Sequence, residues 1–265
     1  MTVNKVQVQK NFGQNAATYD QYAVVQKELA KELLTKVKRT GVCFQRILEI
    51  GCGTGFLTEL LAREYPKALI TAIDIAPEMI ELAREKLADF SNINYFVVDG
   101  ENLQIANIMS FGNPSFDLII SNAVFQWFAD YATAFTQYHS LLELGGYLIF
   151  STFGAGTFKE LYVCLDFKKD PFMASQCLQA VLINSGFQSA GVEEVIKREY
   201  FDSCRTFFRF LKKTGAHNYL AEELSFQGIG TAIFNLIKRY DAMFHSDRGV
   251  PATYQCLYGW GQRIT

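Results

Sequence analysis

Short apolar runs alternate with amphipathic segments through the middle of the chain. Each run ends in glycine or a polar residue, a pattern typical of buried parallel strands joined by helices. The strands predicted in this part are residues 47–50, 69–75, 93–98, 116–122 and 145–153. Amphipathic periodicity predicts helices over 56–63 and 77–87. The alternation predicts an α/β fold with a mostly parallel sheet.

The flanks of this alternating part differ in character. Before it, an amphipathic helix is predicted from the apolar positions Val25, Leu29, Leu33, Leu34 and Val37. The segment ahead of that helix is rich in aromatic residues, which either pack against the sheet or lie over a ligand. Residues 1–40 therefore form an N-terminal helical arm.

The last hundred residues predict a helix over 176–184 and two more strands, over 192–201 and 253–259. Two helical segments, 205–213 and 231–244, lie between these strands. A hairpin needs only a few connecting residues, so residues 203–248 are an insertion. Long insertions in enzymes tend to be lids or substrate-binding elements.

A glycine-rich turn follows the first strand of the alternating part. Glu49-Ile50-Gly51-Cys52-Gly53-Thr54-Gly55 places glycine at every second position and runs into a helix. Glycines there let a ligand press against the backbone, and the helix N-terminus offers free N–H groups. The spacing is G-x-G-x-G rather than the G-x-G-x-x-G of dinucleotide-binding proteins.

Polar residues follow the other strands at the equivalent place. Asp74 ends the second strand about 20 residues after the glycines, where an acid accepts hydrogen bonds from ribose hydroxyls. The alternative for Asp74 is a helix cap. Asp99, Asn122 and Thr152 end the next three strands. Asp99-Gly100-Glu101 is either an adenine contact or a strand-ending turn. Because parallel strands bind ligands at their carboxyl ends, these placements predict one binding edge.

Composition narrows the partners. The 265 residues are 49% hydrophobic, with a formal charge of −2 and a pI near 6.0, so there is no bulk electrostatic drive towards nucleic acid. No apolar run approaches the roughly 18 residues of a membrane span. The sequence predicts a cytoplasmic protein that forms a single domain. Six scattered cysteines without a C-x-x-C pair are expected to be small buried residues, and no metal site is predicted.

The glycine turn and strand-end acids together resemble the class I S-adenosylmethionine (SAM) methyltransferases over residues 45–153. The resemblance implies their Rossmann-like fold, a seven-stranded mostly parallel sheet flanked by helices, here with a helical lid insertion. It also implies SAM as the cofactor, with S-adenosylhomocysteine as its product and no metal. The glycines approach the methionine part, Asp74 the ribose and Asp99 the adenine. The implied cofactor-binding residues are Tyr19, Glu49, Gly51, Cys52, Gly53, Gly55, Asp74, Ile75, Met79, Asp99, Gly100, Glu101, Asn122 and Gln126.

A second resemblance covers nearly the whole chain. Its pieces are Phe12-Gly13…Ala17-x-Tyr19, Ser121-Asn122-x-x-x-Gln126-Trp127, Ser151-Thr152-Phe153…Gly156-Thr157-Phe158-x-Glu160-Leu161, Leu211-Lys212…Gly215-Ala216 and Pro251-x-Thr253-Tyr254. The collinear set is similar to the malonyl-acyl-carrier-protein O-methyltransferases of biotin synthesis. The resemblance implies methylation of the free carboxylate of a malonyl thioester on acyl carrier protein, or on CoA. It also implies that Tyr19 and Gln126 help to close over SAM.

The chemistry agrees with the residues. A carboxylate is already ionised at neutral pH and needs no general base, and the chain has no Ser/His/Asp or Cys/His constellation. Positioning and desolvation would supply the catalysis. The substrate-positioning candidates, which the sequence does not rank, are Tyr19, Gln126, Trp127, Ser151 and Thr152.

A basic helix face is the candidate docking surface for the acidic carrier protein. Arg205, Arg209 and Lys212 recur at helical spacing, with Lys213 beside them. The alternative is a solvated face. Lys213 departs from the family pattern, in which similar sequences often have glycine.

Two other functions remain open from the sequence. One is a methyltransferase for another small molecule, with a carboxylate or quinone acceptor; the other is a SAM-binding regulator without turnover. Methylation of nucleic acid is disfavoured, because Ser121-Asn122-Ala123-Val124 lacks the proline-aromatic motif of the base amino-group enzymes.

Overall fold

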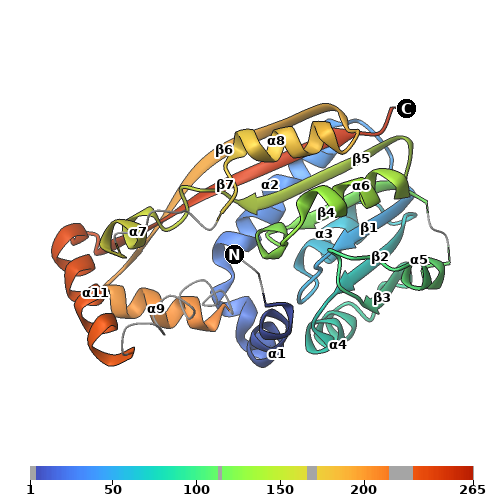
Figure 1. The fold of residues 1–265 in the computed structure, drawn as a ribbon. Helices are drawn as coiled ribbons and strands as arrows, with labels where there is room; N and C mark the ends of the chain where they lie inside the picture. The colour runs from blue at the N-terminus through green and yellow to red at the C-terminus, as the bar shows by residue number, and fades with distance from the viewer. Residues whose placement is uncertain (1–3, 113–114, 166–171, 215–228, 265) are drawn as a thin grey trace.

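Helices cover both faces of a single sheet in the computed structural model of the chain (Figure 1). The structure describes residues 4–112, 115–165, 172–214 and 229–264. The strands in these ranges are β1 (Arg46–Ile50), β2 (Leu69–Asp74), β3 (Ile93–Val97), β4 (Phe116–Asn122), β5 (Leu142–Phe153), β6 (Gln188–Phe201) and β7 (Val250–Gln262). Among the described residues, these seven strands pair in the order β3-β2-β1-β4-β5-β7-β6. The predicted fold class, an α/β fold with a seven-stranded and mostly parallel sheet, is confirmed.

The helices surround this sheet in chain order. They are α1 (Lys5–Tyr22), α2 (Val24–Arg39), α3 (Phe56–Glu64), α4 (Pro77–Lys86), α5 (Ile105–Ser110), the 3-10 helix η1 (Phe125–Trp127), α6 (Tyr131–Leu141), α7 (Lys159–Leu165), α8 (Ser175–Asn184), α9 (Cys204–Lys213) and α11 (Ile229–Phe244). No helix in the described ranges is long and apolar enough to cross a lipid bilayer.

Strands β1 to β5 are parallel, and their carboxyl ends lie at one edge of the sheet. Ile50 at the end of β1 pairs with Ile73 in β2 and with Ser121 in β4. The chain proceeds from β1 outward to β2 and β3, and then returns to the other side of β1 as β4. Ligands of such sheets bind where the strand order reverses, which is here the edge beyond β1 and β4.

Both faces of the sheet are buried, because side chains alternate along each strand. On one face, Ile47 and Ile120 belong to a core that includes residues of α2 and α3. On the other face, Leu48 and Ile119 belong to a core with residues of α6 and α8. Burial on both faces explains why these strands read as nearly continuous apolar runs.

The last two strands extend beyond the rest of the sheet. β7 is antiparallel to both β5 and β6, and its pairing with β5 ends at Phe153 opposite Cys256. Its pairing with β6 continues to Phe201 opposite Val250. Helices α7, α9 and α11 gather around this two-stranded extension (Figure 1).

Helices α9 and α11 belong to the insertion predicted over 203–248. Its residues 215–228, which include Gly215 and Ala216 of the family pattern, lie outside the described residues. The described part shares a core with the main sheet, since Phe207 of α9 and Tyr240 of α11 belong to the same cluster as Leu118. A lid function for this insertion stays a prediction.

The N-terminal arm is a regular helix, α1, beside α4. Asn4 caps it by accepting a hydrogen bond from the Gln7 backbone N–H at 3.1 Å. Gly13 allows the close approach of the two helices, because a Cβ there would lie 2.4 Å from a carboxylate oxygen of Glu78. The arm therefore reaches across to the part of the molecule that follows β2.

Some elements differ from the sequence-based expectations. Helix α6 was not predicted, although its buried positions, Tyr131, Ala134, Phe135, Tyr138 and Leu141, have helical spacing. β5 begins at Leu142 rather than at residue 145. The expectation that all cysteines are buried is wrong for Cys43 and Cys177, which are exposed.

Close packing of β7 against β5 gives a stability prediction. A Cβ on Gly259 would lie 2.2 Å from the ring of Phe150, whose own neighbours are the rings of Phe125 and Phe135. We expect Gly259→Ala to lower the free energy of unfolding by about 1–3 kcal/mol, measured by urea denaturation, because the core cannot accept the extra methyl. In the Phe150→Leu background the same change should cost less. Equal costs in both backgrounds would contradict the contact.

Candidate functional site

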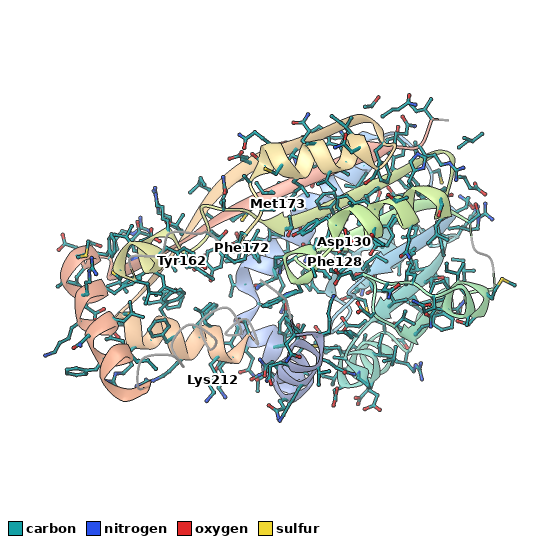
Figure 2. All side chains as sticks on the ribbon, in the orientation of Figure 1. Phe128, Asp130, Tyr162, Phe172, Met173 and Lys212 are labelled. Atoms are coloured by element: carbon teal, nitrogen blue, oxygen red, sulfur yellow. The ribbon has the colours of Figure 1, made fainter. Side chains whose placement is uncertain are left out.

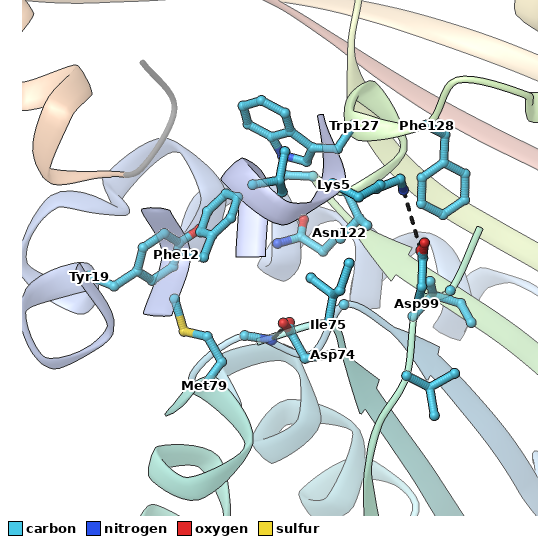
Figure 3. A pocket seen from close by; sticks show the side chains of 18 residues that line it. Lys5, Phe12, Tyr19, Asp74, Ile75, Met79, Asp99, Asn122, Trp127 and Phe128 are labelled. Atoms are coloured by element: carbon cyan, nitrogen blue, oxygen red, sulfur yellow. Dashed lines mark hydrogen bonds and ion pairs between the residues drawn. The ribbon is translucent and has the colours of Figure 1, made fainter. Parts of the chain in front are cut away.

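Three cavities lie along the carboxyl edge of the sheet, and Tyr19 of α1 lines all of them. The edge cavity, of about 640 Å³, is lined by residues that include Gly51, Asp74, Met79 and Asp99 (Figure 3). The turn cavity, of about 390 Å³, is lined by Glu49, Cys52, Gly53, Thr54 and Asn122 among others. The aromatic cavity, of about 450 Å³, is lined by Phe12, Gln126, Trp127, Phe172 and Leu211 among others. These volumes are in the range of small-molecule sites, about 300–1,000 Å³.

Each glycine of the turn has its own structural reason. All three adopt positive φ, which favours glycine. A Cβ on Gly51 would collide with Val124 at 2.3 Å, and one on Gly55 would reach Leu87 at 2.9 Å. A Cβ on Gly53 would meet nothing within 4 Å. Gly51 and Gly55 therefore permit packing, whereas Gly53 leaves open space beside the cavity.

Asp74 connects the end of β2 to the glycine turn. Its carboxylate accepts hydrogen bonds from the backbone N–H groups of Gly53 and Ala76, both at 2.9 Å. Burial raises the pKa of Asp74, and the N–H groups that it accepts from oppose this rise. A carboxylate has about four acceptor positions, so the two bonds leave capacity for a ligand in the edge cavity.

Lys5 of α1 occupies the acidic end of the edge cavity. Its ammonium lies 3.3 Å from Asp99 and 2.5 Å from Glu101, and 4.5 Å from the centre of the Phe128 ring. Figure 3 shows this side chain reaching across the cavity to Asp99. Glu101 also accepts the backbone N–H groups of Ala129 and Asp130 at 2.6 Å. Asp99 lines the cavity, and Glu101 holds the loop behind it.

The other end of α1 is attached to the glycine turn through Asp20. The Thr54 hydroxyl donates to its carboxylate at 2.7 Å, and Lys86 of α4 binds the other oxygen. Lys27 lies 3.7 Å away. Burial alone would raise the pKa of Asp20, but these contacts outweigh it and hold the pKa below its ordinary value.

Glu49 is a buried carboxylate under the glycine turn. It is 1% exposed, and its Oε2 has no hydrogen-bond partner in the described part of the chain. Burial raises its pKa to about 8, and the charge of Asp74 adds to the rise while the Thr58 hydroxyl opposes it. Because Glu49 lines the turn cavity, its acceptor is available to a donor or cation bound there.

A chain of buried hydrogen bonds supports the wall between β4 and β5. The Ser151 hydroxyl donates to Asn122 Oδ1 at 2.7 Å, and the Thr152 hydroxyl donates to Gln126 Oε1 at 3.0 Å. Neither Ser151 nor Thr152 is more than 1% exposed. Among the described cavity linings, neither residue appears, so both orient the two amides instead of facing the cavities.

The wall also contains a strained residue. Ala123 adopts a φ of +55°, which is unusual for a residue other than glycine and is often found at functional sites. Its carbonyl accepts the Gln126 Nε2–H at 2.7 Å, and its N–H donates to Ser151. These bonds fix Asn122 at one cavity and Gln126 at another.

Aromatic rings dominate the aromatic cavity. Phe12 packs edge-to-face on Trp127, with ring centres 5.6 Å apart, and on Tyr19 at 6.1 Å. No lysine, arginine or histidine is among the described residues that line it. Burial, followed by the charges of Asp74 and Asp20, raises the pKa of Tyr19, so its phenol stays a neutral donor.

The predicted docking residues lie outside the cavities. Arg205, Arg209, Lys212 and Lys213 are exposed on α9, and Lys212 points outward from this helix (Figure 2). Their helix turns its opposite face inward, where Leu211 lines the aromatic cavity together with the following Thr214. No carboxylate of the described residues forms an ion pair with these four side chains.

Most of the predicted cofactor-binding residues line the edge or turn cavity. They are Tyr19, Glu49, Gly51, Cys52, Gly53, Asp74, Ile75, Met79, Asp99, Gly100 and Asn122. Gln126 and Trp127 line the aromatic cavity, and Trp127 also lines the edge cavity. Gly55 and Glu101 lie behind these walls.

Sequence reasoning missed four residues, Lys5, Asp20, Gln26 and Thr54. Thr54 lies within the glycine turn itself, and Asp20 follows Tyr19, so adjacency was the available signal. Lys5 and Gln26 had no local signal. Among the described residues, no group of three or more histidine, cysteine or acidic side chains is placed to hold a metal ion.

The buried Glu49 gives a pH-dependent stability prediction. An unfolded glutamate has a pKa of about 4.3, so between there and about pH 8 the folded protein retains a proton that the unfolded chain has lost. Stability should therefore fall as pH rises through this window, relative to a Glu49→Gln variant. We expect a difference on the order of 1 kcal/mol per pH unit in urea denaturation.

Asp74 and Cys52 face Glu49 and titrate in both proteins, so the comparison isolates Glu49. Parallel stability profiles from pH 5 to 8 would show that Glu49 is ionised in the folded protein.

Comparisons with known proteins agree with this geometry. A family model described as a methyltransferase domain matches residues 48–150. Among solved structures, the N-methyltransferase NodS of Bradyrhizobium japonicum in complex with S-adenosyl-L-homocysteine aligns with a TM-score of 0.56 at 18% identity, over 97% of this chain and 98% of that one. The YcgJ protein of Bacillus subtilis aligns with a TM-score of 0.60 at 15% identity, over 89% and 99%. These two likenesses concern the fold.

Curated relatives match over nearly the whole chain. The malonyl-[acyl-carrier protein] O-methyltransferase of Priestia megaterium is 36% identical over 276 residues, which cover 96% of this chain and 96% of that protein. The enzyme of the same name from Acetivibrio thermocellus is 35% identical over 275 residues, covering 97% and 93%. With this identity across the arm, the sheet and the insertion, the chain belongs to the malonyl-[acyl-carrier protein] O-methyltransferase family of class I SAM-dependent methyltransferases.

Proposed function

We propose that this protein transfers the methyl group of SAM to the free carboxylate of a malonyl thioester on acyl carrier protein, an early step of biotin synthesis. The observation that supports the acceptor most is the aromatic cavity, which meets the two acid-lined cavities at Tyr19 and has no basic residue among its described lining. The relatives' name supports the same acceptor.

The acid-lined cavities suit SAM, which has an ammonium and a sulfonium. Glu49 offers a buried oxygen without a partner, and Gly53 leaves open space beside the turn. We assign the turn cavity to the methionine part. Asp74, with acceptor capacity remaining, would hold the ribose hydroxyls.

The edge cavity would hold the adenosine part. Asp99 would accept the adenine amino group in place of the Lys5 ammonium, and Met79 and Ile75 would pack on the base. Pairing with a cation in the protein alone is consistent with an acid that later accepts from an amino group. Cys52, Gly100 and Asn122 would complete the contacts.

The aromatic cavity suits a carboxylate nucleophile. When SAM is bound, it supplies an electrophilic methyl: a carboxylate oxygen forms the new O–CH₃ bond, the S–CH₃ bond breaks, and its electron pair stays on sulfur. Opposite charges cancel in this transfer, so surroundings that solvate charge poorly favour it. Phe12, Trp127 and Phe172 provide such surroundings.

Neutral donors would orient the acceptor without quenching it. A lysine or arginine would stabilise the carboxylate more than the ester and would slow the reaction. Tyr19 stays protonated because its pKa is raised, and Gln126 is held by Ala123 and Thr152. Trp127 packs against the same cavity, while Ser151 and Thr152 orient the amides of Asn122 and Gln126.

The exposed face of α9 suits an acidic carrier protein. Arg205, Arg209, Lys212 and Lys213 lie on the outside of a helix whose inner face contributes Leu211 to the aromatic cavity. A carrier docked there would have a short path for its thioester arm into this cavity. The charge of this face, rather than the net charge of −2, would attract the partner.

A panel of acceptors tests the reaction. The protein would be incubated with methyl-labelled SAM and equimolar malonyl-carrier protein, acetyl-carrier protein, malonyl-CoA, a free dicarboxylate or a quinol. We expect label as a base-labile ester on the malonyl thioesters, with the carrier-bound one preferred. Label on the quinol or dicarboxylate instead would establish another acceptor, and no label on any acceptor would favour a regulatory SAM-binding protein.

Asp74→Ala tests the ribose assignment. We expect the dissociation constant of SAM, measured by calorimetry, to rise about ten-fold or more because charge-assisted hydrogen bonds are lost. Asp89→Ala, at an exposed position after α4, is the matched control and should leave the affinity unchanged. Unchanged affinity in a folded Asp74→Ala protein would remove the assignment.

Charge reversal on α9 tests the docking surface. Arg209→Glu or Lys212→Glu should lower kcat/KM for the malonyl-carrier protein about ten-fold, with little effect on malonyl-pantetheine, because only the protein substrate meets the surface. Lys67→Glu, exposed before β2 at the opposite edge of the sheet, is the control. Equal losses on both substrates would rule out docking at α9.

A further inference from the structure

Gln26 of α2 lies at the junction of two cavities. Besides Tyr19, it is the one residue shared by the described linings of the turn cavity and the aromatic cavity. On the proposed function, these two cavities hold the methionine part of the cofactor and the acceptor. A side chain at their junction is therefore close to the point where the methyl group passes between them.

The backbone of Gln26 is held firmly. Its carbonyl accepts the Asn122 Nδ2–H at 3.0 Å, and Asn122 is fixed in turn by the Ser151 hydroxyl. Its neighbours Val25 and Leu29 are at most 1% exposed in the core beneath α2. Substitutions of the Gln26 side chain leave all of these contacts in place.

The side-chain amide of Gln26, in contrast, has no hydrogen bond to another described residue. The amide of Gln126 is different, since its nitrogen binds Ala123 at 2.7 Å and its oxygen accepts from Thr152 at 3.0 Å. Gln26 is half-buried, so its amide is at the cavity surface rather than in bulk water. A half-buried amide donor without a partner is suited to bind a polar ligand group.

We propose that the Gln26 amide N–H groups bind the carboxylate of the malonyl thioester and that Gln26 is a positioning residue for the acceptor; this rests on the proposed function. A neutral amide donor holds an anionic oxygen more strongly than an ester oxygen. The contact therefore favours the substrate and weakens once the carboxylate has become a methyl ester. Gln26 thus contributes both to the choice of a free carboxylate and to release of the product.

The test compares two ligands that differ by the transferred methyl group. Binding of malonyl-pantetheine and of its methyl ester would be measured by calorimetry on protein saturated with S-adenosylhomocysteine. We expect Gln26→Leu to weaken malonyl-pantetheine about ten-fold or more and the methyl ester less than about three-fold, since hydrogen bonds to charged groups are the stronger ones. Gln21→Leu, at an exposed position of α1, should change neither.

A second variant gives a readout that cavity shape alone would not move. In Gln26→Glu the new carboxylate repels the ligand at neutral pH, and affinity for malonyl-pantetheine should recover as the pH falls below about 5 and the glutamate becomes a neutral donor. The affinity for S-adenosylhomocysteine should be unchanged in both variants.

Equal losses for both ligands in Gln26→Leu, no loss for either, or a pH-independent Gln26→Glu protein would overturn the assignment of Gln26. A wild-type protein that binds and methylates other acceptors but not malonyl thioesters would overturn the proposed function, and the inference with it. The two failures are distinguished by the wild-type protein alone.

Discussion

Polar contacts at both ends of α1 hold this helix across the carboxyl edge of the sheet, and the geometry of the site depends on them. At one end Lys5 binds Asp99 and Glu101; at the other, Asp20 binds Thr54 and Lys86. Between these ends, Tyr19 comes to lie where three cavities meet. Without α1, the strand-end acids would face solvent, where their hydrogen bonds and charges are worth much less.

The charges of the site are divided between its two halves. Acids line the cavities over the glycine turn and β2, while aromatic rings and neutral amides line the cavity beside α9. This division matches a reaction between a cationic cofactor and an anionic acceptor, in which both charges disappear. Buried hydrogen bonds from Ser151 and Thr152 keep the amides between these halves in place.

The sequence predicted what local pattern determines. The five parallel strands, the glycine turn and the acids at strand ends all follow from short motifs and spacing, and most of the predicted residues line the cavities. Contacts between distant segments were not predictable. Lys5 meets Asp99 across 94 residues and Asp20 meets Thr54 across 34, and only the packing of α1 on α4 brings them together. The role of Gln26 likewise depends on where α2 meets β4. Helix α6 was missed because its spacing went unused between two stronger strand signals.

A crystal structure with S-adenosylhomocysteine and malonyl-pantetheine tests the division of the site most directly. The account predicts adenosine density beside Asp74 and Asp99, the homocysteine part over Gly53, and the malonyl carboxylate in the aromatic cavity on the other side of Tyr19. Cofactor density outside the edge and turn cavities, or an acceptor carboxylate bound by lysine or arginine away from the aromatic cavity, would contradict it.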